Sequence, residues 1–244
     1  MVGRGFPWLV GRVVETRSET STSRTIVFDV PGWVGHLAGQ HVDVRLTAED
    51  GYSTQRSYSI ATPSDGQRVA LTIQRVPAGE VSPYLVEEIV VGDEVELRGP
   101  IGGWFVWRPD ESGRVLLVAG GSGVVPLMAM VRERSRTRST APFTLIYSVR
   151  SPREVYYADE LSRCAAETVD VSVLYTRSAP AGAERAPGRI SSDDLARHSW
   201  PPGPGGRTYV CGPTAFVEAV VGLLLEQGHD PATIRTERFG PTGG

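Results

Sequence analysis

The chain has 244 residues, 40% of them hydrophobic and 22% charged, which is enough to bury two cores of ordinary size and argues against wholesale disorder. The formal net charge is −3 and every basic residue is arginine, so the composition gives no support to a general affinity for nucleic acid or anionic membranes. Two cysteines, Cys164 and Cys211, are too few for a disulfide framework or a thiolate metal cage, and the apolar N-terminal stretch is too short for a signal peptide. We therefore expect a cytoplasmic protein without a metal centre.

The first half of the chain, from Leu9 to about Arg108, consists of short alternating apolar and polar runs separated by Gly, Pro, Asp and Ser. These runs are LVGRVVET, RTIVFDV, HVDVRL, RSYSIA, VALTIQRV and EVELRG. Period-two alternation at this spacing predicts an antiparallel barrel or sandwich. One short helix, expected from Ser82 to Ile89, interrupts the strands.

The rhythm changes after the polar segment from Arg108 to Arg114. Apolar runs are now followed by helix-length segments, and this alternation predicts a parallel sheet. The expected strands are RVLLVAG, FTLIYSV, VDVSVLYT and TYVCG, and the expected helices run through Met128, around Asp159 to Ala166, near Ser192 to Arg197, and from Thr214 to Glu226. We accordingly place one domain at 1–110 and a second at 111–244.

A glycine turn follows the first strand of the second half, in VLLVAGGSGVVPLMAM. Gly121 and Gly123 would let a pyrophosphate approach free backbone N–H groups at the start of a helix. The spacing departs from the usual dinucleotide fingerprint at Pro126, and a tight turn without a ligand is the alternative. Cys211, in YVCGP, ends another strand of the same sheet and could face the same crevice, or it could simply be a small buried residue.

The run RSYSIA is polar for a strand. Alternation places Arg56, Tyr58 and Ile60 on one face and Ser57 and Ser59 on the other. A planar guanidinium, a flat ring and a hydroxyl would suit a ligand with a heteroaromatic ring and a phosphate, although a solvent-facing strand would have a similar composition.

A second candidate anion site lies in RVPAGEVSPYL. Ser82 is expected to be the N-cap of the short helix, with Pro83 at its first position. Backbone N–H groups there could take a pyrophosphate, or the segment could be a capped surface helix.

Six motifs together resemble the ferredoxin–NADP reductase superfamily of flavoprotein reductases: RSYS at 56–59, GEVSPYL at 79–85, GPIGGWF at 99–105, GGSGVVP at 120–126, CGP at 211–213 and ERF at 237–239. They occur in family order over nearly the whole chain. The resemblance implies an α+β protein of two domains, with a six-stranded antiparallel β-barrel that binds FAD followed by an α/β parallel-sheet domain that binds NAD(P).

The resemblance also implies roles for individual residues. Ser59, Cys211 and Glu237 would lie at the reacting centre, with Ser59 near the reactive flavin nitrogen and Cys211 beside the nicotinamide. Phe239 would cover a flavin face, although GPTGG follows it here, whereas the aromatic ends the chain in plastid-type members. The full expected cofactor-binding set is Arg56, Ser57, Tyr58, Ser59, Ile73, Gln74, Arg75, Gly79, Val81, Ser82, Gly121, Ser122, Gly123, Arg150, Arg177, Cys211, Gly212, Pro213 and Phe239.

The implied reaction is hydride transfer from NAD(P)H to FAD, followed by single-electron transfer to a separate protein such as a ferredoxin or an oxygenase component. None of the four histidines forms a catalytic arrangement, and cofactor chemistry of this kind needs none. Arg150 and Arg177, each at a strand end, favour NADPH through its 2′-phosphate. The alternatives are a reductase of a small acceptor (free flavin, quinone or a ferric chelate) and a flavin-binding relay subunit that does not turn over NAD(P)H. We expect a monomer.

Overall fold

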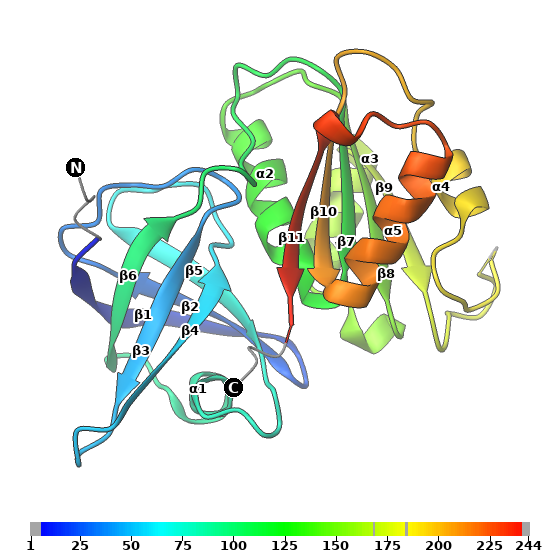
Figure 1. The fold of residues 1–244 in the computed structure, drawn as a ribbon. Coiled ribbons are helices and arrows are strands. Elements are labelled where there is room, and N and C mark those ends of the chain that lie inside the picture. The colour runs from blue at the N-terminus through cyan, green and yellow to red at the C-terminus, as the bar shows by residue number, and fades with distance from the viewer. Residues whose placement is uncertain (1–5, 168, 184, 241–244) are drawn as a thin grey trace. The chain divides into compact units, whose positions relative to one another are not determined.

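The computed structural model describes residues 6–167, 169–183 and 185–240. The chain forms two compact units (Figure 1). The first comprises Met1–Arg108 with Met128–Glu133, and the second comprises Pro109–Leu127 with Arg134–Gly244. The limits 1–110 and 111–244 expected from the sequence remain a proposal for the two domains. None of the described helices combines the length and apolar character needed to span a bilayer.

The first unit is built on a six-stranded antiparallel sheet, as the alternating runs predict. Its strands are β1 (Trp8–Thr20), β2 (Ser23–Asp29), β3 (His41–Thr47), β4 (Ser53–Ser59), β5 (Arg68–Gln74) and β6 (Glu94–Ile101). Their order is β4-β3-β6-β1-β2-β5. An antiparallel bridge between Ile60 and Leu71 joins the two edges, which closes the sheet into a barrel.

Alternate residues of these strands fill the barrel core. The cluster includes Val13, Ile26, Phe28, Val42, Val44, Val69, Leu71, Ile73, Val95 and Leu97, all nearly inaccessible to solvent. Leu85 and Ile89, from the segment between β5 and β6, join the same cluster. Apolar burial of this extent, at about 25 cal/mol per Å², is the main stabilising contribution to such a barrel.

The segment between β5 and β6 holds the predicted short helix, but its beginning was predicted wrongly. A single α-helical turn, α1 (Val81–Pro83), continues as a π-helix, η1 (Tyr84–Glu88). Glu80 occupies the N-cap, so Ser82 is the second helical residue and Pro83 the third. The hydroxyl of Ser82 instead accepts a hydrogen bond from the N–H of Val76 at 3.0 Å, which ties the helix to the preceding loop.

The second unit contains a five-stranded parallel sheet. Its strands are β7 (Val115–Gly120), β8 (Phe143–Val149), β9 (Asp170–Tyr175), β10 (Arg207–Pro213) and β11 (Ile234–Phe239), in the order β11-β10-β7-β8-β9. The helices are η2 (Gly121–Gly123), α2 (Val124–Arg136), η3 (Pro152–Glu154), α3 (Ala158–Glu167), α4 (Ser192–His198), α5 (Thr214–Glu226) and η4 (Pro231–Thr233). The predicted strand–helix alternation is confirmed, and β11 is an additional strand.

The central strands of this sheet are buried along their whole length and are mainly apolar, because both faces are covered. Every residue of β7 and β8 is buried. On one face, alternate strand residues pack with α4 and α5 in a cluster of Leu116, Val118, Ile146, Leu174, Leu195, Val210, Val217, Val220, Leu224 and Ile234 (Figure 1). A parallel sheet covered on both faces leaves its strand ends as the places where polar groups can meet a ligand.

Candidate functional site

The first candidate site lies along β4, an edge strand of the barrel. β4 pairs with β3 over its whole length, from Ser53 to Ser59. Its other edge meets β5 only through the bridge at Ile60, and α1 lies beside it. β4, which carries the predicted flavin-binding residues, is thus paired along its length on one side only.

Tyr58 and Arg56 share one face of β4, as alternation predicts, but differ in exposure. Tyr58 is partly buried against the barrel core, and this burial raises the pKa of its phenol despite the opposing charge of Arg56. The Arg56 guanidinium is exposed and donates to the carbonyl of Gln55 at 2.7 Å and the hydroxyl of Thr54 at 3.3 Å. Both partners are uncharged, so these contacts do not neutralise the positive charge of Arg56, which can still attract an anion.

Ser59 is the polar residue of β4 whose surroundings point most directly to a ligand. The residue is 5% exposed, and its Oγ has no hydrogen-bond partner in the part of the chain that the structure describes. A buried, unsatisfied hydroxyl costs about 1–3 kcal/mol, so it calls for a polar partner. A ligand atom able to donate or accept a hydrogen bond would satisfy it.

Ser57 takes part in a different interaction. Its hydroxyl donates to Oδ1 of Asp43 at 2.6 Å, and Arg98 donates to Oδ2 at 2.7 Å. Although burial opposes ionisation, the hydrogen bonds from Ser57 and Arg98 lower the pKa of Asp43. The hydroxyl proton of Ser57 is therefore already committed to the barrel, and its contact with a cofactor stays a prediction.

The turn before α1 is shaped by Gly79. A Cβ at this position would lie 3.2 Å from both Oγ of Ser82 and the carbonyl oxygen of Val76, which is tighter than ordinary packing. Val81 and Ser82 are buried just beyond it. Gly79 therefore lets the backbone of this turn pack closely against Val76 and Ser82, with its own N–H donating to the carbonyl of Val76 at 2.9 Å.

The predicted residues at the end of β5 have mixed environments. Ile73 is fully buried, Gln74 is exposed, and the guanidinium of Arg75 pairs with Glu87 at 2.8 Å. The side chain of Ile73 belongs to the barrel core, so this residue could contact a cofactor only through its backbone.

In the second unit, the glycine turn joins β7 to α2. Gly121 has φ +55°, and a Cβ there would meet no atom within 4 Å, so the turn is open on this side. Gly123 lies against the neighbouring strand, where its Cβ would be 2.1 Å from the carbonyl oxygen of Cys211. One glycine thus leaves room for a ligand, and the other permits close packing of the helix start on β10.

The strand order places a crossover point at this turn. β7 lies between β10 and β8, so the chain leaves β7 toward one side and returns on the other. In open parallel sheets, ligands bind at such a switch point, beyond the carboxyl ends of the strands. The structure brings Gly121, Ser122 and Gly123 together with Cys211, Gly212 and Pro213 at this point.

Cys211 and Glu237 are direct neighbours on β10 and β11. The thiol is completely buried, and burial raises its pKa well above the ordinary value, so the sulfur is a neutral thiol. Burial also raises the pKa of Glu237 to about 7. The pair can therefore supply a weak S–H donor and a carboxyl group that carries a proton near neutral pH.

Phe239 ends β11 opposite Pro213 and is half-buried. Of the five residues after it, Gly240 is described and 241–244 lie outside the described residues. Contact of its ring with a flavin stays a prediction.

Arg150 and Arg177 follow the neighbouring strands β8 and β9. The carbonyl of Arg150 accepts the N–H of Arg177 at 2.9 Å and that of Ser178 at 3.1 Å, so the two arginines occupy adjoining positions. Both side chains are exposed, and Arg150 lies 3.8 Å from Glu154. Two positively charged side chains therefore lie at the neighbouring ends of β8 and β9, where they could bind a phosphate.

Comparison with known proteins assigns a family to both units. Residues 11–106 match the oxidoreductase FAD-binding domain, and residues 117–222 match the oxidoreductase NAD-binding domain. The chain belongs to the ferredoxin–NADP reductase superfamily. The superfamily fold, a flavin-binding antiparallel barrel with a nucleotide-binding parallel sheet, is the one the sequence predicts.

Individual relatives are similar over most of the chain. The ferredoxin–NAD(P)+ reductase component of naphthalene 1,2-dioxygenase/salicylate 5-hydroxylase systems from Ralstonia sp. is 34% identical over 207 residues, covering 84% of this chain and 61% of the relative. The glycine betaine monooxygenase reductase subunit from Pseudomonas aeruginosa is 32% identical over 245 residues, covering 95% and 64%. The chain therefore spans about three fifths of the length of these two curated relatives.

A solved structure of similar extent is the flavohem-like FAD/NAD-binding domain of nitric oxide dioxygenase from Vibrio cholerae. It aligns with a TM-score of 0.85 at 27% identity, over 98% of this chain and 100% of that one.

Sequence reasoning missed the interactions that support the predicted residues. Asp43, which holds Ser57 and Arg98, has an ordinary place in an alternating strand and gives no signal of its own. Asp194, which pairs with Arg185, does have a recognisable sequence signal. Ser191-x-x-Asp194 has the spacing of a capping box, and an acidic residue there predicts an anchored helix start.

Proposed function

We propose that the protein takes hydride from NAD(P)H onto bound FAD and passes electrons one at a time to a separate protein, either ferredoxin-like or an oxygenase component. The two relatives above are named as reductase components or subunits of oxygenase systems, which supports this choice of acceptor. The observation that carries the proposal is the buried Oγ of Ser59 without a partner among the described residues, beside Tyr58 in an FAD-binding domain.

The barrel residues would hold the flavin. Arg56 and the backbone turn from Gly79 to Ser82 would bind its pyrophosphate, since a charged fork and backbone N–H groups both stabilise phosphate. Tyr58 would orient the ring by stacking, and Ser59 would hydrogen-bond a polar ring atom. Bound FAD supplies the ability to accept two electrons as hydride and release them singly.

The parallel-sheet residues would hold the nucleotide. The open turn at Gly121 would take the pyrophosphate at the start of α2, and Cys211 would pack beside the nicotinamide. Glu237, protonated near neutral pH, would hold a proton within reach of the same strand ends. Arg150 and Arg177 lead us to propose NADPH as the preferred donor, with a charge-assisted contact worth about 1.5–3 kcal/mol.

An anaerobic titration of the purified protein with NADPH and with NADH tests the proposal. We expect a yellow protein whose flavin absorption bleaches with a stoichiometric amount of nucleotide, with NADPH effective at lower concentration. A folded, colourless sample that takes up no added FAD would refute it. A yellow sample that neither nucleotide bleaches would indicate a relay subunit instead.

The acceptor is tested by steady-state turnover. We propose that a ferredoxin or oxygenase component is reduced faster than free flavin, a quinone or a ferric chelate at matched concentration. The reverse order would identify a reductase of small acceptors. The proposal includes a cytoplasmic location and a monomeric state, and the latter is checked by light scattering.

A further inference from the structure

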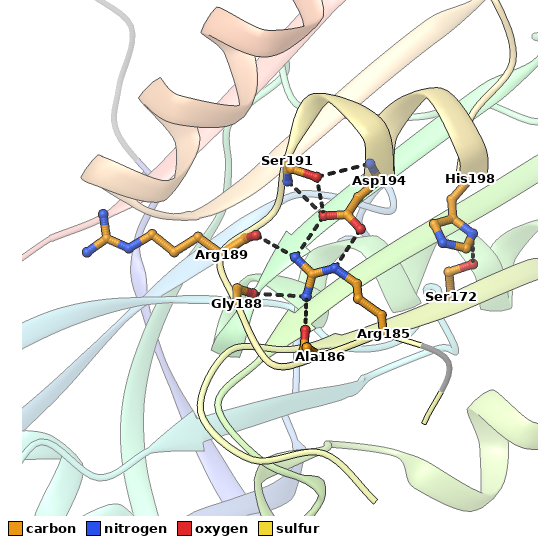
Figure 2. A network of polar contacts seen from close by, with 8 residues as sticks. All are labelled: Ser172, Arg185, Ala186, Gly188, Arg189, Ser191, Asp194 and His198. Atoms are coloured by element: carbon orange, nitrogen blue, oxygen red, sulfur yellow. Dashed lines mark hydrogen bonds and ion pairs between the residues drawn. The ribbon is translucent and has the colours of Figure 1, made fainter. Parts of the chain in front are cut away.

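One arginine holds the connection between β9 and α4 (Figure 2). The Nε of Arg185 lies 2.6 Å from Oδ1 of Asp194, and its Nη2 lies 2.8 Å from Oδ2. The same guanidinium donates to three carbonyl groups of its own loop, those of Ala186, Gly188 and Arg189, at 3.2, 3.2 and 2.6 Å. Arg185 therefore gathers this loop onto the first turn of α4.

The carboxylate of Asp194 is also held by groups other than Arg185. It is 4% exposed and accepts hydrogen bonds from the backbone N–H and the hydroxyl of Ser191, at 2.8 and 2.7 Å. Although burial opposes ionisation, hydrogen bonds from Ser191 and the interaction with Arg185 lower the pKa of Asp194. The pair is thus ionised, bidentate and largely shielded from water, which is the geometry in which such a contact is strongest.

Backbone hydrogen bonds continue from this pair to the strand ends. The N–H of Gly188, whose carbonyl Arg185 binds, donates to the carbonyl of Tyr175 at 3.0 Å. Two residues on, the N–H of Arg177 donates to the carbonyl of Arg150 at 2.9 Å. The position of the loop is therefore coupled to the place where both arginines lie.

The far end of α4 is anchored to the same strand. Nδ1 of His198 lies 2.9 Å from Oγ of Ser172 on β9 (Figure 2). Between this anchor and Arg185 lies a hollow of ≈ 280 Å³, lined also by Tyr175 and Pro180. If Arg185 lost its contacts, the part of the loop that lines this hollow could move, while the hydrogen bond between His198 and Ser172 would keep the end of α4 in place.

We propose that the Arg185–Asp194 pair is a positioning device that fixes the β9–α4 connection and so presents Arg150 and Arg177 to the phosphate of NAD(P)H. The inference rests on the proposed function for the identity of the ligand. Arg185 and Asp194 act through the loop and not by touching the nucleotide. When only a fraction of molecules holds a binding-competent arrangement, the apparent dissociation constant rises by the inverse of that fraction.

The test compares Arg185→Met with Arg189→Met. Both substitutions remove one positive charge from the same loop, but the exposed side chain of Arg189 points away from the network, while its carbonyl is kept in either variant (Figure 2). In Arg185→Met we expect KM for the nucleotide to rise about five- to tenfold with kcat within about twofold, measured with ferricyanide as acceptor. Arg189→Met should match the parent.

Amide hydrogen exchange provides a readout that needs neither nucleotide nor turnover. We expect faster exchange at Thr176, Arg177 and Gly188 in Arg185→Met but not in Arg189→Met, because their N–H groups depend on the loop's position. Arg185→Lys, which keeps the charge but loses the fork, should lie between the parent and Arg185→Met in both measurements. Flavin content should be equal in all variants.

Unchanged exchange and KM in Arg185→Met would overturn the inference, as would a fall in kcat with no change in KM. If that variant does not fold, Asp194→Asn replaces it, because asparagine keeps an oxygen that can accept from the N–H of the N-cap residue Ser191 but removes the negative charge that faces Arg185. The same rise in KM is then expected, and its absence refutes the positioning role. A parent protein that accepts electrons from neither nucleotide would instead refute the proposed function, while exchange would still report whether Arg185 orders the loop.

Discussion

Arg56 and Arg177 are both exposed arginines, yet they are expected to serve different ligands. Replacing Arg56 with alanine removes a charged contact worth about 1.5–3 kcal/mol and should weaken FAD binding roughly ten- to hundredfold. Arg177→Ala should leave FAD bound and raise KM for NADPH. The measurement is the ratio of flavin to protein absorbance after gel filtration, and equal ratios in the two variants would contradict the assignment.

Glu237 gives the second residue-scale prediction, because burial raises its pKa from 4.5 to about 7. The folded protein then holds a proton that the unfolded chain releases between these values. The corresponding stability is fully present below pH 4.5 and is lost as the pH rises through about 7. Glu237→Gln should therefore unfold with a flatter pH dependence and be more stable than the parent at pH 8, by at most about 3 kcal/mol.

Urea titrations between pH 5 and 8 measure this difference, with the exposed Glu226→Gln as the matched control. Parallel pH curves for Glu237→Gln and the parent would show that the carboxyl group is already ionised in the folded protein.

Sequence alone predicted the residue types of the candidate site better than their surroundings. Alternation correctly separates Tyr58 from the two serines, but it treats Ser57 and Ser59 alike. In the structure, Ser57 donates to Asp43 across the sheet, whereas Ser59 is enclosed without a partner among the described residues. The difference comes from which residue each serine faces on β3, and strand register depends on long-range pairing.

At the scale of elements, the turn between β7 and α2 contains two glycines that are needed for different reasons. In Gly123→Ala the new Cβ would overlap the carbonyl of Cys211, so the helix start must move, at a cost of about 3 kcal/mol. In Gly121→Ala the space is open, and only the left-handed backbone is disfavoured, by about 1 kcal/mol. We expect Gly123→Ala to lower the unfolding temperature more and to weaken NAD(P)H binding more.

Thermal unfolding and the nucleotide KM test this order, and the flavin content, which depends on the barrel, serves as the internal control. Equal losses in the two glycine variants would place the cause outside the Cys211 contact.

The errors among the predicted elements have local causes. β11 was missed because IRTERF alternates weakly and is only partly buried, as suits an edge strand. The start of α1 was misplaced because Ser-Pro has the appearance of a helix start. The hydroxyl of Ser82 bonds the N–H of Val76 six residues earlier, an interaction that capping rules do not contain.

For the whole molecule, FAD binding should contribute directly to stability. A ligand that binds only the folded state adds about 2.7 kcal/mol when its free concentration is a hundred times its dissociation constant. Calorimetry with and without added FAD should show a higher unfolding temperature for the parent and a smaller rise for Arg56→Ala. A transition that FAD does not move would argue against a flavin site in the barrel.

The change of period near residue 110 was enough to predict two sheets of opposite kind, because period-two alternation and strand–helix alternation have different packing requirements. Strand order was beyond reach. The crossover beside β7 arises because β10 pairs with it, for example Arg207 with Val115, and local patterns contain no information about pairings so distant in the chain.

The two cysteines differ in a way that is useful at the bench. Cys211 is buried in the structure, while Cys164 on α3 is partly exposed to solvent. A maleimide dye should therefore modify the native protein at Cys164 alone, which provides a specific attachment point for fluorescence without any engineered cysteine. Loss of that selectivity, seen as a second equivalent of dye, would signal that the thiol of Cys211 on β10 has become exposed.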